Sequence, residues 1–320
     1  MGVAKTRWAT RKTRRARVLR TVSLRSPGGP LEAAFVPKAG MLGWSLRHGV
    51  EELLGHPVSL TEYVRAGFPT AIPVLHPWAN RLASPEYEIA GRRVTLDLSA
   101  PNVHTDPGGL PIHGLAAASS RWELLHEEPA RLRARLDYAA WPELVAGFPF
   151  PHLLELSVEL SDERMEIGTE LTPTGDVPVP VAFGFHPHLR LPGLDRRLWL
   201  LELPVTSRMV LDERMLPTGE SEPVEIPPAP LGERTFDDAF DGFTDPPEFA
   251  ITGAGRRLSL RFQEGYRFAQ VYAPPGSDFI CFEPMTAPVN PFESRRTQLA
   301  EPGSKYRAQF EIAVAPGSRS

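Results

Sequence analysis

The side chains best suited to proton transfer in this chain are histidines in apolar turns and one glutamate. His113, His186 and His188 stand beside glycine or proline, and an imidazole can give or take a proton near neutral pH. Glu283 follows the mostly apolar run 278–282 and precedes a proline, which predicts a carboxylate at the end of a buried strand. Such a carboxylate is either a salt-bridged structural group or a general base with a raised pKa. The chain therefore offers candidates for both partners of acid–base catalysis.

A metal site is a second interpretation of His186-Pro187-His188, because imidazoles two residues apart on a strand point the same way. We do not favour it, since no third ligand lies nearby in the sequence and Pro187 disturbs the strand. The single cysteine, Cys281, also excludes sites built from cysteine clusters. Glycine-rich phosphate loops, G-x-S-x-G turns and H-E-x-x-H helices are missing from the sequence. We therefore expect neither a metal nor a cofactor.

Five segments combine ionisable or aromatic side chains with turn formers, as functional loops on a rigid scaffold do. They are 73–82 (PVLHPWANRL), 111–122 (PIHGLAAASSRW), 181–191 (VAFGFHPHLRL), 282–292 (FEPMTAPVNPF) and, more weakly, 235–240 (TFDDAF). Some residues in these segments suit a purely structural role as well. Trp78 and Trp122 suit a core, and Asn80-Arg81 suits a surface turn as well as a pair of hydroxyl-binding donors.

The elements that must position these segments are strands. Apolar and polar side chains alternate with a period of two, the pattern of a strand with one wet face, in 131–138, 258–263 and 306–314. The same alternation on both sides of Ser161-Asp162-Glu163 predicts an antiparallel hairpin of 154–160 with 165–171. We also expect a smaller hairpin around Ala90-Gly91. The pattern indicates an all-β fold, a large antiparallel β-sandwich.

One short helix is expected in this β-rich chain. Ser59-x-x-Glu62 has the spacing of a capping box, in which the first and fourth residues satisfy each other's backbone donors. The sequence Gly67-Phe68-Pro69 then ends the helix.

Composition bounds the rest. The 320 residues contain 35 prolines and 26 glycines, which indicates many turns, and they contain no apolar run of membrane-spanning length. Nine of the 35 basic side chains fall in residues 1–25, which have no acidic one, so 26 basic side chains face 39 acidic ones in the rest of the chain. We expect residues 1–25 to be a disordered basic tail and 26–320 to form a single β-sandwich domain.

The same numbers bear on partners and location. The basic residues 1–25 also suit an arm that binds nucleic acid, but we do not favour this interpretation, because an acidic body repels a phosphate backbone. No apolar stretch typical of an export signal follows the basic residues, and the lone cysteine cannot form an internal disulfide, so we expect a cytoplasmic protein without a membrane anchor. No feature of the sequence indicates an oligomeric state.

Taken in order, the motifs resemble those of the aldose 1-epimerase (mutarotase) family, the galactose mutarotase-like supersandwiches. The resemblance rests on Pro77-Trp78-Ala79-Asn80-Arg81, Ile112-His113-Gly114-Leu115 with Trp122 behind it, Phe183-Gly184-Phe185-His186-Pro187, Asp237-Asp238-Ala239-Phe240 and Glu283-Pro284-Met285-Thr286. The family fold is also all-β, in agreement with the alternation above. The resemblance implies interconversion of the α and β anomers of an aldose, without cofactor or metal.

By the resemblance, Glu283 is the base that removes the proton from the C1 hydroxyl, and His186 is the acid that protonates the ring oxygen. We expect the two groups on opposite sides of a pyranose, across a cavity about as wide as one monosaccharide. Partial burial must raise the pKa of Glu283, and an acidic pocket would favour the protonated form of His186.

The resemblance also implies substrate-binding residues: His113 near the ring oxygen and C1, Asn80 and Arg81 at hydroxyls, Asp237 at two neighbouring hydroxyls, and Trp78 against the ring face. Asp238 is an alternative to Asp237, because the adjacent pair makes the alignment ambiguous. Phe185 stands where galactose mutarotases typically have asparagine, which leaves the sugar open. Two alternatives remain: a hexose-6-phosphate 1-epimerase, with Arg190 or Arg121 contributing to a phosphate pocket, and a carbohydrate-binding module without catalysis.

Overall fold

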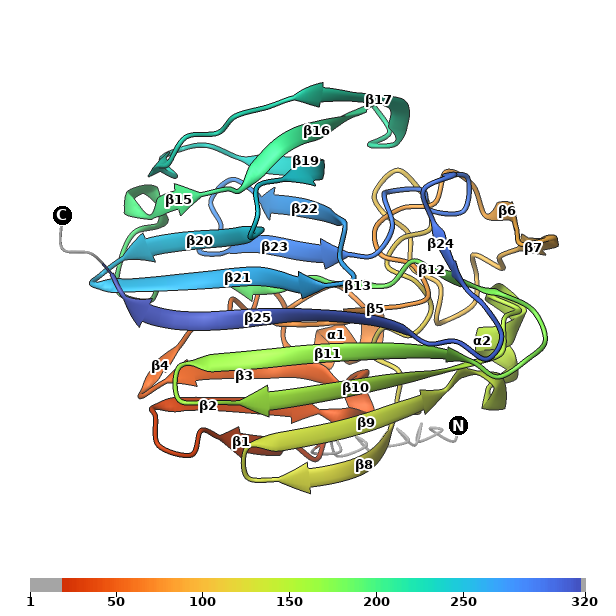
Figure 1. The fold of residues 1–320 in the computed structure, drawn as a ribbon, viewed down its shortest axis with the longest axis horizontal. Coiled ribbons are helices and arrows are strands. Elements are labelled where there is room, and N and C mark those ends of the chain that lie inside the picture. The colour runs from red at the N-terminus through yellow and green to blue at the C-terminus, as the bar shows by residue number, and fades with distance from the viewer. Residues whose placement is uncertain (1–18, 318–320) are drawn as a thin grey trace, which may run out of the picture.

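The computed structural model describes residues 19–317, and most of its elements are strands in antiparallel sheets (Figure 1). The largest sheet has nine strands, in the order β18 (Ala229–Pro230), β15 (Leu200–Glu202), β20 (Glu248–Gly253), β21 (Arg256–Glu264), β25 (Tyr306–Pro316), β11 (Arg164–Pro173), β10 (His152–Leu160), β9 (Arg131–Asp137) and β8 (Glu123–Glu128). Strands β9 and β10 alternate buried residues with more exposed ones, as the sequence predicts for a sheet with one solvated face.

The second sheet has eight strands and carries much of the chemistry described below. Its order is β17 (Pro217–Pro223), β16 (Val205–Leu211), β19 (Phe236–Phe243), β22 (Phe268–Ala273), β23 (Ile280–Met285), β13 (Gly184–Phe185) and β5 (Val74–Leu75), with β14 (His188–Leu189) also paired to β23. A four-stranded sheet contains β1 (Val22–Arg25), β2 (Leu31–Val36), β3 (Leu42–His48) and β4 (Glu51–Glu52). Two short pairs are β6 (Glu86–Ile89) with β7 (Arg92–Thr95), and β12 (Val179–Val181) with β24 (Gln298–Ala300).

The two largest sheets pack face to face through aromatic side chains. Phe249 of β20 lies 5.4 Å from Phe282 of β23, and Phe185 of β13 lies 5.0 Å from Phe310 of β25, between ring centroids. These rings belong to a main core of buried apolar side chains that extends from Val22 to Val314. Because side chains alternate along a strand, the neighbours of Phe282 on β23 must point to the opposite face of the eight-stranded sheet.

The predicted all-β fold and its hairpins are confirmed. Strands β10 and β11 pair from His152 with Pro173 to Leu160 with Met165, and β6 and β7 pair around Ala90-Gly91. Both turn residues, Ala90 and Gly91, have positive φ, the geometry of a tight two-residue hairpin turn.

The predicted helix is α1 (Leu60–Ala66). Ser59 and Glu62 form the reciprocal capping box, and Gly67 ends the helix in the left-handed conformation. A second helix, α2 (Pro142–Gly147), and three short 3-10 turns, η1 (Pro37–Ala39), η2 (Tyr138–Ala140) and η3 (Arg196–Leu198), were not predicted. Within residues 19–317, no helix is both long and apolar enough to cross a membrane.

Two boundaries expected from the sequence are wrong. The segment 1–25 was assigned to a tail, but Val22–Arg25 is strand β1, which pairs with β2; residues 1–18 of that tail lie outside the described residues. Glu283 was expected at a strand end, but β23 continues through Pro284 to Met285. A proline has a backbone angle compatible with a strand and removes only one hydrogen bond from the ladder, so it did not end β23.

Candidate active site

One face of the eight-stranded sheet gathers polar side chains from three neighbouring strands. The strand register places Asp237 of β19 opposite Tyr272 of β22, and Gln270 of β22 opposite Glu283 of β23. Gln270, Tyr272 and Glu283 therefore share one face with Asp237, whereas Phe282 faces the core. Of these, Gln270 and Glu283 are almost completely buried.

His186 joins this face from the turn between β13 and β14. Its backbone N–H lies 3.4 Å from the carbonyl oxygen of Pro73, and its side chain is 8% exposed. Nε2 of His186 lies 3.2 Å from Oε1 of Glu283. The imidazole and the carboxylate are therefore in direct contact.

This contact corrects the expectation that the two groups lie on opposite sides of a sugar ring. The C1 hydroxyl oxygen and the ring oxygen of a pyranose are both bonded to C1. An acid and a base can therefore serve these two oxygens without lying on opposite sides of the ring, and the 3.2 Å separation is compatible with that arrangement.

Two loops complete the site from the side of the sheet edge. Asn80 and Arg81 follow β5, and His113 lies in a second loop. The backbone N–H of His113 donates to the carbonyl oxygen of Asn80 over 3.0 Å and joins the two loops. Both Asn80 and His113 have positive φ. Gly114 is required where the loops cross, because a Cβ there would lie 2.2 Å from the carbonyl oxygen of His76.

These elements enclose a cavity of about 480 Å³, within the range usual for small-molecule sites. Six of the seven side chains named from the sequence line it: Asn80, Arg81, His113, His186, Asp237 and Glu283. The lining also contains apolar residues, among them Pro57, Val58, Phe68, Pro69, Pro107 and Phe279.

Trp78 does not line this cavity, which corrects the expectation that it contacts a sugar. Its side chain is fully buried and lies edge-on to Phe292, with ring centroids 5.8 Å apart. Asp238 does not line the cavity either; its Oδ1 accepts a hydrogen bond from Arg208 over 3.2 Å. Of the two adjacent aspartates, the structure thus places Asp237 in the cavity.

Sequence reasoning missed four polar side chains of the cavity: Thr105, Asp106, Gln270 and Tyr272. Gln270 donates from Nε2 to Oδ1 of Asp237 over 2.6 Å, and Asp106 accepts from Nε of Arg81 over 2.7 Å. Gln270 could have been singled out in the sequence, because it is the single strongly polar side chain in the strand FAQVYA. Asp106 lies in a turn 25 residues after Arg81, and nothing local pointed to their pairing.

Burial controls the protonation of the central pair. Removal from water raises the pKa of Glu283 well above its usual value, and the charge of Asp237 adds to this effect. Burial likewise lowers the pKa of His186 well below its usual value, with His188 and His113 acting in the same direction. Burial therefore opposes the protonated form of His186, which an acidic pocket was expected to favour.

Burial also shifts the pKa values of His113 and Asp237, two further ionisable groups of the cavity. Burial lowers the pKa of His113 to about 3, so this imidazole is neutral and can donate or accept a hydrogen bond. Burial raises the pKa of Asp237, against the opposing effects of Arg81 and the hydrogen bond from Gln270.

Several buried polar atoms at this site have no partner within the described chain. They are Nδ1 of His113, Nδ1 of His186, Oε1 of Gln270 and Oε2 of Glu283. A buried polar atom without a partner costs free energy, so such atoms gathered around one cavity indicate a polar ligand.

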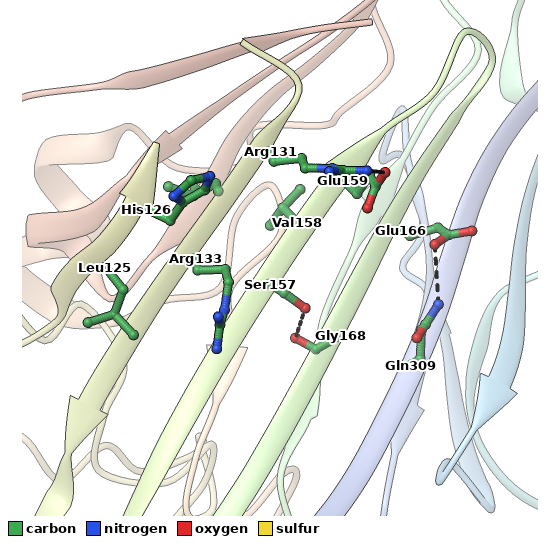
Figure 2. Close-up of a pocket in the computed structure, with 11 residues that line it drawn as sticks. Leu125, His126, Arg131, Arg133, Ser157, Val158, Glu159, Glu166, Gly168 and Gln309 are labelled. Carbon is green, nitrogen blue, oxygen red and sulfur yellow. Dashed lines mark hydrogen bonds and ion pairs between the residues drawn. The ribbon is translucent and has the colours of Figure 1, made fainter. Parts of the chain in front are cut away.

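A second hollow, of about 470 Å³, lies on the outer face of the nine-stranded sheet (Figure 2). Its polar side chains bond to one another: Arg131 to Glu159 over 2.7 Å, and Gln309 to Glu166 over 3.3 Å. None of its lining residues has a buried side-chain polar atom without a partner in the described part of the chain. We therefore assign the chemistry to the first cavity.

The chain matches the family described as aldose 1-epimerase over residues 39–313. No curated protein is significantly similar to it in sequence.

Solved structures share the fold at low sequence identity. A protein of Synechocystis sp. PCC 6803 is 22% identical, with a TM-score of 0.76 and coverage of 93% of this chain and 96% of its own. A galactose mutarotase-like protein of Clostridium acetobutylicum is 16% identical, with a TM-score of 0.80 and the same coverage, 93% and 96%. An aldose epimerase homologue from C. elegans is 16% identical, with a TM-score of 0.75 and coverage of 94% and 100%.

Proposed function

Because the chain belongs to the aldose 1-epimerase family, we propose that it interconverts the α and β anomers of an unphosphorylated hexose, with Glu283 and His186 as the proton carriers. The observation that carries this proposal is their 3.2 Å contact at the wall of a cavity of small-molecule size. General acid and general base catalysis are each worth on the order of 10²–10⁴ in rate.

The proposed reaction opens and recloses the sugar ring. Glu283 takes the proton of the C1 hydroxyl while His186 gives a proton to the ring oxygen. The bond between C1 and the ring oxygen breaks, and a C1 carbonyl forms. Rotation about the C1–C2 bond presents the other face of the aldehyde, and closure returns both protons.

The directions of the pKa shifts suit this cycle. In the neutral pair, Glu283 is protonated and His186 is an uncharged imidazole with a single ring N–H. Ring opening leaves the two groups in this state. Burial favours this state. The ion pair that starts the reaction forms when a proton passes from Glu283 to His186 across their contact.

The remaining polar side chains are assigned to sugar binding. Arg81, held by Asp106, and Asn80 donate to hydroxyl oxygens; Asp237, held by Gln270, accepts from hydroxyls. His113 bonds near the ring oxygen, since its ring lies 5.5 Å from that of His186.

The charge of the cavity favours a sugar without phosphate. Among the described residues that line it, Arg81 is the only lysine or arginine, and Asp106 already pairs with it. Two further carboxyl groups, those of Asp237 and Glu283, line the same space. A phosphate dianion would meet these groups without a free cation to balance it.

Polarimetry on freshly dissolved α-glucose and α-galactose tests the proposal. We expect the protein to accelerate the decay of optical rotation, and Glu283→Gln to remove at least about two orders of magnitude of that acceleration. Glu311→Gln is the matched control, because Glu311 is equally buried but pairs with Arg164 and Arg261 outside the cavity. A wild-type rate equal to that of buffer across a panel of aldoses would refute the proposal.

The same proteins separate catalysis from simple binding. Calorimetric binding of a sugar without acceleration, left unchanged by Glu283→Gln, would instead identify a carbohydrate-binding module.

A further inference from the structure

Three side chains able to bind a metal ion lie together at the site, and one of them, His186, is also a member of the proposed catalytic pair. One ligating atom each of His186, His188 and Cys281 lie within 4.8 Å of one another, and all three side chains are buried. His186 and His188 line the cavity.

Strand pairing creates this cluster. Cys281 of β23 stands opposite His188 of β14 in the register. His186 precedes His188 by two residues, and their rings stack with centroids 4.6 Å apart at an interplanar angle of 15°. The sequence argued against a metal site because it offers no third ligand near the two histidines. The fold supplies one in Cys281, which is 93 residues after His188 in the chain.

The hydrogen bond of His188 leaves this imidazole ready to act as a ligand. Nδ1 of His188 lies 3.1 Å from the carbonyl oxygen of Ala71, which can only accept, so Nδ1 carries the proton and Nε2 has a free lone pair. A backbone carbonyl that orients an imidazole in this way is the usual outer partner of a metal-binding histidine. Nδ1 of His186 is buried and has no partner in the described chain. It can bind a cation when its proton is lost to the buffer and the proton of Glu283 passes to Nε2 across their contact.

We propose that His186, His188 and Cys281 bind a borderline or soft divalent cation, such as Zn²⁺ or Cd²⁺, and that the bound ion inhibits the enzyme by occupying His186. The inhibitory part of this inference rests on the proposed function; the binding part does not. Two imidazoles and a thiolate select such ions over Mg²⁺ and Ca²⁺, which prefer oxygen ligands.

The geometry requires a small adjustment. Zn–N bonds of about 2.0–2.1 Å and a Zn–S bond of about 2.3 Å place tetrahedral ligand atoms roughly 3.3–3.6 Å apart. Rotation of the side chains by roughly an ångström at their tips closes the cluster from its present spacing. On binding, the Cys281 thiol loses its proton to the buffer and the sulfur bonds to the ion. Because His186 and His188 line the cavity, water from the cavity can fill the fourth position.

Cobalt absorption tests binding directly. One equivalent of Co²⁺ added to the metal-free protein should give thiolate-to-cobalt charge-transfer absorption in the near ultraviolet and the visible bands of a tetrahedral centre. Cys281→Ser and Cys281→Ala, each checked for folding by circular dichroism, should lose the charge-transfer absorption. Absence of the band in the wild type, or its persistence in a folded Cys281 variant, would overturn the site.

Inhibition forms a separate arm. Zn²⁺ should slow mutarotation at concentrations where it binds, whereas Mg²⁺ should not. Loss of a metal ligand should cost at least as much affinity as loss of a ligand's outer hydrogen-bond partner, which is about tenfold or more. The Cys281→Ser variant should therefore keep its basal rate and need at least about tenfold more Zn²⁺ for the same inhibition. Equal sensitivity of the two proteins would contradict the inhibitory role. If the chain proved to have no epimerase activity, the cobalt spectrum would still decide whether the site exists.

Discussion

A buried pair of histidines behind the site makes the stability of this protein depend on pH. Nε2 of His76 lies 2.8 Å from Nε2 of His152, and Nδ1 of His152 lies 2.6 Å from the carbonyl oxygen of Phe150. The carbonyl can only accept, so Nδ1 of His152 carries a proton and its Nε2 accepts from His76. Both imidazoles are neutral, since burial lowers the pKa of His152 to about 4 and that of His76 well below its usual value.

The substitution His152→Phe measures this coupling. In the unfolded chain a histidine has a pKa of about 6.5, so between about pH 7.5 and pH 5 the unfolded state takes up a proton at this position and the folded state does not. The free energy of unfolding must therefore fall as the pH falls, by about 2 kcal/mol for His152 alone over this range. The variant lacks this contribution and should lose about 2 kcal/mol less than the wild type.

The variant should also be less stable at pH 7.5. Phenylalanine preserves the stacking on Tyr138, whose ring centroid lies 4.5 Å from that of His152, but it leaves the N–H of His76 unpaired. An unpaired buried donor costs about 1–3 kcal/mol. The two stability curves should therefore approach each other, or cross, as the pH falls.

Urea denaturation at several pH values provides the assay. Tyr138→Phe is the control: it removes the hydrogen bond from the Tyr138 hydroxyl to the carbonyl oxygen of Leu144 in the same cluster, but it removes no group that titrates between pH 5 and pH 7.5. Its curve should run parallel to that of the wild type. A parallel curve for His152→Phe as well would show that the buried pair is not the source of the pH dependence.

Three further predictions concern the site. Asp106→Asn should raise KM about tenfold in polarimetry, because it weakens the 2.7 Å charge-assisted bond that holds Arg81, a bond worth about 1.5–3 kcal/mol; an unchanged KM would contradict the assigned role. Gln270→Leu should raise the pKa of Asp237 further, since the substitution removes a hydrogen bond that lowers this pKa. As the pH is lowered, KM should then begin to rise at a higher pH in the variant than in the wild type. Trp78→Phe should lower the free energy of unfolding by about 1–3 kcal/mol and leave KM within about twofold of the wild-type value, because the side chain belongs to the core; a large rise in KM with unchanged stability would return it to the site.

The sequence by itself determined the strands and the residue types available for catalysis. The hairpin of β10 and β11 could be predicted because alternation of apolar and polar side chains is a local property of a strand with one wet face. The capping box of α1 was likewise visible, because Ser59 and Glu62 satisfy donors only three residues apart. Strand β1 escaped because its four residues lie beside a basic segment and are too few to show a clear period.

Tertiary structure decided which of these residues meet. The contact of His186 with Glu283, the pairing of Asp106 with Arg81 and the position of Cys281 beside His188 each join segments far apart in the chain. Their proximity follows from strand register and from the crossing of loops, both of which result from packing of the whole core. Burial, which sets the pKa values of His186 and Glu283, is a property of the same packed core, and so the protonation of the site could be known only from the folded protein.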